Sequence, residues 1–284
     1  PTHIMCNLPL SRLSQAVPRS GSLRRELRQA SREPWLTQWT EEPAEFEHFF
    51  THMHVPFVTR RFGPDASYYG LHRLRRVFRF GGLVQLLDKG RSRAGLLCRR
   101  AGHTFESLVF GETNESSSIL HAGGTSLLNE AFVRRAEALG CSEASFGLAP
   151  AQLQNGLFRY KKNWGVRITY SPYRRADYFM RWDSLNEPVF QFLAKTGFIF
   201  TLAGRLSALS VTDTRIPTEK ARAVRGLLLP GLERLFLVHR ETAQHDARTD
   251  HKRVITIPFG ALRGQDSKTL KQVLNAYLSH SAEG

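Results

Sequence analysis

GLFRYKKNWG, residues 156–165, sets two adjacent lysines among three aromatic side chains and has a glycine at each end. The residues shortly before it, Ser145-Phe146-Gly147-Leu148, are typical of a short strand that leaves the interior. This order predicts a helix and a turn at the mouth of a site, where a lysine could face a substrate. On spacing alone, an amphipathic helix whose aromatic rings only pack is an equally good interpretation.

The segments around it alternate between helical and strand patterns. Lys89-Gly90 and Ala101-Gly102 are turn-forming pairs, so the strands around them should form an antiparallel meander. Thr125 is expected to cap a helix that ends at Gly140. Residues 1–19 indicate a strand and a loop. Helices are predicted over 22–30, 42–53, 68–80 and 125–139, a helix and a turn over 156–165, and strands over 83–89, 93–100, 104–110, 141–147 and 166–171.

The pattern is weaker beyond residue 188. Residues 189–209 are apolar, 218–239 have a helical pattern, 254–259 resemble a strand, and 268–278 indicate a terminal helix. These segments are expected to form a mixed extension or a small second domain.

Composition limits the class of protein. The 284-residue chain contains no run of 18 to 20 apolar residues, so no transmembrane helix is expected. No secretory leader follows Pro1. Three widely separated cysteines favour a reducing compartment and packing roles, and we expect a cytoplasmic protein. Those cysteines are Cys6, Cys98 and Cys141.

The chain is strongly basic. Forty lysines and arginines against 25 acidic residues give a net charge of +15. Such an excess, mostly arginine in short clusters, suits a phosphate-bearing partner such as RNA, DNA or an anionic lipid. An arginine-rich proteome would produce the same surface without any partner.

The stretch from Leu127 to Tyr170 resembles the closing half of a GNAT-like domain in the FemABX peptidyltransferases and their acetyltransferase-like relatives. Those families share a strand, a small-residue turn and the pattern Gly-Leu-aromatic-x-aromatic-Lys-x-x-aromatic-Gly, an order that Ser145 to Gly165 matches. The resemblance implies an α/β (α+β) protein with a mixed, largely antiparallel sheet flanked by helices. It also implies a strand over 35–39 and three parts: 1–34, an N-terminal strand and helix segment that would be the remnant of a first GNAT-like domain; 35–187, the transferase domain; and 188–284, a C-terminal extension or small second domain.

The resemblance names candidate catalytic residues. In Fem-type ligases, a lysine matching Lys161 is thought to stabilise charge on the aminoacyl ester, so Lys161 is the first candidate and Lys162 the second. A solvent-facing role for either lysine is the alternative. Many relatives have an aspartate where this chain has Ser145, which removes one carboxylate from consideration.

Other residues are candidates for binding. Aromatic side chains interleaved with basic ones can hold single-stranded RNA by stacking and phosphate contact. The pyrophosphate loop of acyl-CoA users is missing, and its nearest substitute is the run from His121 to Thr125. Two glycines at such a place more often form a helix lead-in than a phosphate-binding loop. The donor- and acceptor-binding candidates are Phe158, Arg159, Tyr160, Trp164, Gly123, Gly124 and Thr125. The candidate general bases are His121 and Glu112.

These residues predict an enzyme that forms an amide. The preferred reaction transfers an aminoacyl group from aminoacyl-tRNA to an amine on a peptide, a peptidoglycan precursor or a natural product. The alternatives are an acyl-CoA-dependent N-acyltransferase and a non-catalytic RNA-binding protein. We expect tRNA as a partner, no covalently bound cofactor and no metal, because the i, i+4 pair His48 and His52 lacks the glutamate of the zinc protease pattern.

Overall fold

The structure is a computed structural model that describes residues 1–10, 20–63, 69–114, 119–171, 186–212, 227–239, 254–258 and Leu274. The chain divides into two compact units. Unit 1 comprises residues 1–5, 148–162 and 167–284, and unit 2 comprises residues 6–147 and 163–166. The division of the chain at residues 34 and 187 stays a prediction.

Unit 2 contains most of the regular structure. Two strands, β1 (His3–Pro9) and β6 (Glu143–Pro150), belong partly to each unit. The other elements of unit 2 are α1 (Gly21–Ala30), β2 (Trp35–Thr40), α2 (Pro43–Phe49), η2 (Phe50–His54), α3 (Val55–Phe62), α4 (Leu71–Phe78), β3 (Gly81–Asp88), β4 (Arg91–Ala101), β5 (Thr104–Glu112), η3 (Leu120–Gly124) and α6 (Thr125–Ala138).

The large sheet is mixed. Its strand order is β2-β3-β4-β5-β6-β1-β7, where β7 is Arg167–Tyr170. Strands β2 to β5 pair antiparallel, whereas β5 and β6 are parallel. The two turn-forming pairs predict the part from β3 to β5. The expected α/β arrangement of a mixed, largely antiparallel sheet flanked by helices is therefore confirmed.

The parallel pair is short. Residues Thr104 to Glu106 pair with Glu143 to Ser145, and the register of β5 and β6 extends no further. Two residues later, Gly147 has a φ of +72°, a conformation that favours glycine, and its N–H donates to the Ser145 hydroxyl over 3.3 Å. Strand β6 therefore departs from the regular ladder at Gly147.

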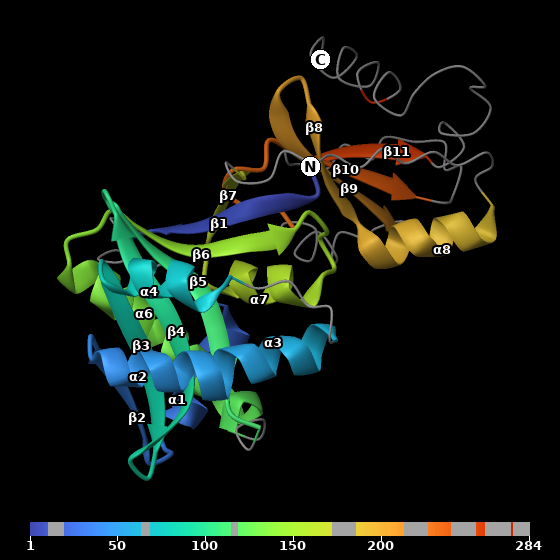
Figure 1. Ribbon diagram of the computed structural model, residues 1–284. Coiled ribbons are helices and arrows are strands. Elements are labelled where there is room, and N and C mark those ends of the chain that lie inside the picture. Colours follow the sequence, from blue (N-terminus) through green and yellow to red (C-terminus); the bar gives the residue numbers. More distant parts are fainter. Residues whose placement is uncertain are drawn as a thin grey trace. The chain divides into compact units, whose positions relative to one another are not determined.

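Helices cover both faces of the strands of unit 2. Figure 1 shows α2, α3 and α4 over one face, and α1 and α6 over the other. On the first face, Phe46, Phe78 and Leu97 belong to one buried cluster. On the second, Phe105 stacks on Phe132 of α6 with ring centroids 5.4 Å apart.

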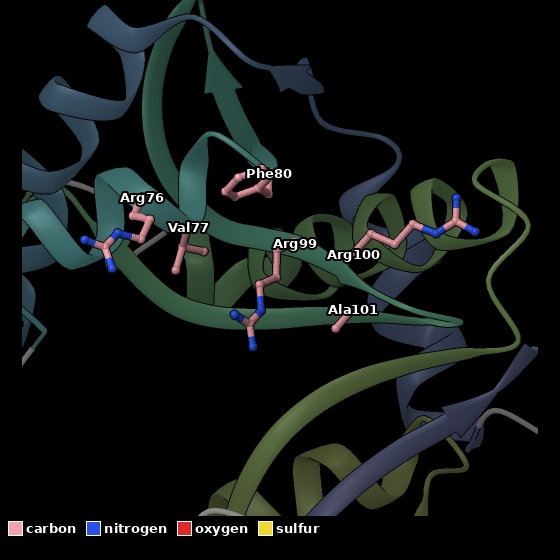
Figure 2. Close-up of a pocket in the computed structure, with 6 residues that line it drawn as sticks. All are labelled: Arg76, Val77, Phe80, Arg99, Arg100 and Ala101. Atoms are coloured by element: carbon pink, nitrogen blue, oxygen red, sulfur yellow. The ribbon is translucent and has the colours of Figure 1, made fainter.

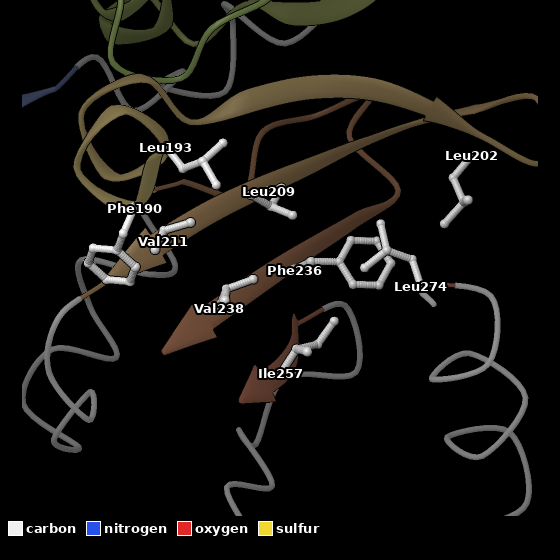
Figure 3. Packing of buried hydrophobic residues seen from close by; sticks show 9 residues of the cluster. All are labelled: Phe190, Leu193, Leu202, Leu209, Val211, Phe236, Val238, Ile257 and Leu274. Atoms are coloured by element: carbon white, nitrogen blue, oxygen red, sulfur yellow. The ribbon is translucent and has the colours of Figure 1, made fainter. Parts of the chain in front are cut away.

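Unit 1 has its own sheet and core. Strands β8 and β9 are antiparallel, while β9, β10 and β11 are parallel. Figure 3 shows Phe190 and Leu193 of α8 packed with buried side chains of this sheet, such as Leu209 and Phe236. The elements are α7 (Gly156–Asn163), α8 (Glu187–Thr196), β8 (Phe198–Leu202), β9 (Arg205–Thr212), β10 (Arg234–His239) and β11 (Val254–Pro258).

Three sequence predictions need correction. The helix expected over 218–239 is wrong in its described part, because residues 234–239 form strand β10 between two parallel neighbours. The helix expected over 42–53 continues to Phe62, with a π-helical turn before Pro56, which has no N–H to donate. Gly124, not Thr125, is the N-cap residue of α6. The helix expected over 268–278 lies outside the described residues, apart from Leu274.

Candidate functional site

Helix α7 begins at an asparagine cap. The Asn155 side-chain oxygen accepts from the backbone N–H groups of Leu157 at 3.0 Å and Phe158 at 3.2 Å. Such a cap satisfies amides that the first helical turn leaves without a partner. The cap fixes where the helix starts and therefore which residues face the interior. Phe158 and Lys161, three positions apart, are the two buried side chains of α7.

Lys161 is a buried lysine. Only 7% of the residue is exposed, and its Nζ donates to the backbone oxygen of Leu148 over 2.7 Å. Burying an ammonium group is unfavourable unless partners compensate it, so this bond helps to hold the charge in place. Leu148 lies on β6, just beyond Gly147 and the residues that pair with β5. The Lys161 amino group is thus fixed beside the irregular part of β6.

The surroundings of Lys162 shift its pKa. Burial lowers the pKa of Lys162, and the nearby positive charge of Arg159 lowers it further. Both effects disfavour the ammonium form. Lys162 therefore becomes a neutral amine at a lower pH than an ordinary lysine. Arg159 itself is exposed, and Tyr160 is half-buried.

The other two aromatic residues of the motif are in the interior. Phe158 and Trp164 have no exposed surface, and the Trp164 ring lies 5.4 Å from that of Phe146. A fully buried ring offers no face to a nucleobase. In this structure these two side chains pack in the core, which agrees with the alternative interpretation of the motif.

The glycine loop before α6 is closely packed. Gly123 has a φ of +110°, and a Cβ atom there would lie 2.9 Å from the Ala30 Cβ. A Cβ on Gly124 would lie 2.8 Å from the Leu86 side chain. The glycines are thus needed for close contact with α1 and β3, which fits a helix lead-in better than an open phosphate loop.

The two candidate bases and the lysines belong to different units. Glu112 forms an ion pair with Arg60 at 2.6 Å, and His121 is exposed. Both residues, with Gly123, Gly124 and Thr125, lie in unit 2, whereas Lys161 and Lys162 lie in unit 1. The structure brings the lysines together with Arg159 on α7. The assignment of a general base stays a prediction.

Sequence reasoning missed a basic pocket in unit 2. Figure 2 shows its lining, which encloses about 380 Å³ and comes from α4, the turn after it and the end of β4. The basic clusters were visible in the sequence, but the contact between them depends on strand pairing. The lining residues are Arg76, Val77, Phe80, Arg99, Arg100 and Ala101.

Three further features bear on the sequence predictions. No helix among the described residues is long and apolar enough to cross a membrane. Within the same part of the chain, no group of three or more His, Cys, Asp and Glu residues is placed to hold a metal ion. All three cysteines are buried, as expected for packing residues.

Known proteins are similar to this chain in structure only. No protein-family model and no curated protein matches the chain. The crystal structure of FemX is 13% identical with a TM-score of 0.48, and the match covers 60% of each chain. The C-terminal domain of a putative lysylphosphatidylglycerol synthetase from Agrobacterium fabrum is 10% identical with a TM-score of 0.44, covering 59% of this chain and 58% of that one.

L-PGS from Bacillus licheniformis is 11% identical with a TM-score of 0.43, covering 59% of this chain and 57% of that one. The chain therefore spans between 57% and 60% of the length of each of these three structures.

Proposed function

We propose that this chain is an acyltransferase that forms an amide bond by moving an aminoacyl group from aminoacyl-tRNA to an amine. The amine nitrogen attacks the ester carbonyl carbon and forms the new C–N bond. The ester C–O bond then breaks, and the terminal ribose hydroxyl of the tRNA leaves with the proton that the amine loses.

The observation that carries this proposal is the fixed, buried amino group of Lys161. Negative charge develops on the carbonyl oxygen as the amine attacks, and a positive group held in a site of low dielectric stabilises it. Lys161 is 7% exposed and is held by Leu148 at 2.7 Å, so little reorganisation is needed when the charge appears. A flexible surface lysine would lack this advantage.

Lys162 supports the same reaction in a different way. An attacking amine must lose a proton during transfer, and a lysine with a lowered pKa is better suited to accept it than an ordinary lysine. We therefore assign Lys161 to charge stabilisation and Lys162 to proton transfer. His121 and Glu112 remain the alternative bases.

Two observations favour tRNA over acyl-CoA as the donor. The chain carries a net charge of +15, which suits a polyanion better than a small thioester. The sequence candidate for a pyrophosphate loop is packed against α1 and β3, since a Cβ on Gly123 would lie 2.9 Å from the Ala30 Cβ and one on Gly124 would lie 2.8 Å from the Leu86 side chain. Neither observation selects the amino acid or the amine.

The test is a transfer assay with two donors. Purified protein is incubated with mixed radiolabelled aminoacyl-tRNA, or with radiolabelled acetyl-CoA, and a panel of amines: a lysine-containing peptide, an amino sugar and phosphatidylethanolamine. We expect amide product from aminoacyl-tRNA. Product from acetyl-CoA alone would identify an acyl-CoA enzyme, and tRNA binding without product from either donor would favour a non-catalytic RNA-binding protein.

Lys161→Ala and Lys195→Ala form the matched pair for this assay. Lys195 is an exposed lysine of α8, so its loss changes the net charge equally without touching α7. Product formation that depends on Lys161 but not on Lys195 supports the proposal.

A further inference from the structure

The basic pocket of unit 2 is built around a close approach of two strands. Gly81 at the start of β3 pairs with Arg99 of β4, and a Cβ on Gly81 would lie only 1.9 Å from the Cys98 backbone oxygen. Any other residue would push the strands apart. The pairing brings the preceding residue, Phe80, to the end of β4.

The Phe80 ring is held in an exposed position. Its backbone N–H donates to the Val77 oxygen over 3.0 Å, which fixes the turn between α4 and β3. The residue is nevertheless 75% exposed, the highest value among the large hydrophobic side chains described. Water contact with so much of a phenylalanine ring is unfavourable, and the neighbouring side chains leave the ring uncovered.

The surroundings of the ring are positively charged. Arg76 and Arg100 line the pocket and are exposed, and neither forms an ion pair with a carboxylate in the described part of the chain. Arg99 is different, because its charge is offset by Glu106 at 2.8 Å. The sequence from 66 to 87 contains four arginines and no acidic residue. An anion at this pocket therefore meets excess positive charge.

We propose that this pocket binds single-stranded RNA, with a base stacked on Phe80 and the adjoining phosphates held by Arg76 and Arg100. An exposed aromatic ring beside arginines is the combination by which proteins hold single strands without strong sequence preference. The arginine guanidinium is planar and can donate two hydrogen bonds to one phosphate. The proposal rests on the proposed function for its choice of RNA, since it names a surface for the nucleic-acid part of the donor.

An anionic membrane is the competing partner, and the pocket fits it less well. Membrane-binding faces present several apolar side chains that enter the lipid together. Here Phe80 is the one exposed large hydrophobic residue of the lining, and three arginines belong to the same lining. A recess of about 380 Å³ is in the size range of sites for small ligands and suits one base with its phosphate.

The test is direct binding of a fluorescent single-stranded RNA dodecamer of mixed sequence to the full chain over a salt series. We expect Phe80→Ala to weaken binding about 10-fold, the effect of losing one stacked base. We expect Arg76→Ala and Arg100→Ala each to reduce the slope of log K against log salt by about 0.7, the value for one lost phosphate contact on a single strand.

Two control variants match these changes. Arg91→Ala removes an exposed arginine at the opposite end of the same strand, and Phe192→Ala removes an exposed phenylalanine of α8. Both should bind the dodecamer like the unaltered chain. All five variants change exposed side chains, so an unchanged unfolding temperature verifies that each one folds.

Binding that is absent, or that is equal in the pocket and control variants, would overturn the inference. The inference would also be overturned if the pocket variants lost binding to phosphatidylglycerol vesicles but bound RNA like the unaltered chain. That result would identify a membrane-facing surface. The proposed function is judged separately by Lys161-dependent transfer. If Lys161-dependent transfer is found but RNA binding does not depend on the pocket residues, only the proposal for the pocket is refuted. If RNA binding depends on the pocket residues but no transfer occurs, only the proposed enzymatic function is refuted.

Discussion

The α7 region and the basic pocket combine the same residue types with opposite exposure. In the α7 region, Lys161 is 7% exposed and Trp164 is completely buried. In the pocket, Arg76 and Arg100 are exposed and Phe80 is 75% exposed. A buried cation suits stabilisation of charge during a reaction, whereas exposed cations beside an open ring suit contact with a polyanion. Basic and aromatic residues together therefore do not define one kind of site. The burial of these side chains distinguishes a site for catalysis from a surface for binding a polyanion.

The largest expected difference concerns the two aromatic rings. Trp164→Ala should lower the free energy of unfolding by about 3–5 kcal/mol, because it leaves a cavity in the core beside Phe146. Phe80→Ala should change that free energy by no more than about 0.5 kcal/mol, because its ring is exposed. Denaturant unfolding of both variants measures the contrast. Equal losses of stability would mean that the two regions do not differ in burial as described.

A smaller effect is expected for the buried lysine. Lys161→Ala should lower the free energy of unfolding by about 1–3 kcal/mol, since the Leu148 oxygen loses its charged donor. Lys195→Ala, at an exposed position, should stay within about 0.5 kcal/mol of the unaltered chain. Thermal or denaturant unfolding decides this. A Lys161 variant as stable as the Lys195 variant would indicate that the bond to Leu148 does not contribute.

The two glycine segments offer a third comparison. Gly123→Ala should destabilise the protein by about 1 kcal/mol or more, because φ is +110° and Ala30 occupies the space a Cβ needs. Gly156→Ala, at the start of α7, should be neutral or stabilise by up to about 1 kcal/mol, because no atom lies within 4 Å of a Cβ there. Melting temperatures of the two variants test both expectations. If Gly123→Ala does not lower the melting temperature, the loop is not closely packed, and it becomes a candidate phosphate-binding site again.

The subtlest prediction is the pH dependence from Lys162. Burial and Arg159 lower its folded-state pKa, so the unfolded chain binds more protons between that lowered pKa and the ordinary value of about 10.4. Stability from this group should therefore rise with pH across that interval. The Lys162→Met variant lacks this titrating group. Its free energy of unfolding should exceed that of the unaltered chain by the largest amount at neutral pH, and the difference should shrink toward pH 10. A difference in the free energy of unfolding that does not change with pH would contradict the lowered pKa of Lys162.

Most elements of the fold could be predicted because their signals are local. The turns at Lys89-Gly90 and Ala101-Gly102 specify the meander, and apolar periodicity indicates the helices of unit 2. Strand β10 could not be predicted, since a short apolar run is compatible with a helix until parallel partners flank it. The same limit applies to any segment whose structure depends on distant pairing.

The site could be predicted only in part for related reasons. The lysine pair and its helix are visible in the sequence. Which lysine is buried depends on which residues of α7 face the interior, and the Asn155 cap sets where the helix begins. The pocket combines residues 76–80 with residues 99–101, which meet because Gly81 pairs with Arg99. The sequence segment rich in aromatic and basic residues therefore indicated Phe158 and Trp164, which are buried, whereas the exposed Phe80 lies outside that segment.

The most direct test of the account is a single-turnover measurement of aminoacyl transfer from labelled aminoacyl-tRNA to the best amine of the panel, with Lys161→Ala and Lys195→Ala side by side. If Lys161 stabilises the developing charge, its loss should slow the transfer step about 100-fold or more at saturating donor, while the Lys195 variant keeps the original rate. A Lys161→Ala rate within about twofold of the unaltered chain, less than 1 kcal/mol in the barrier, would contradict the account.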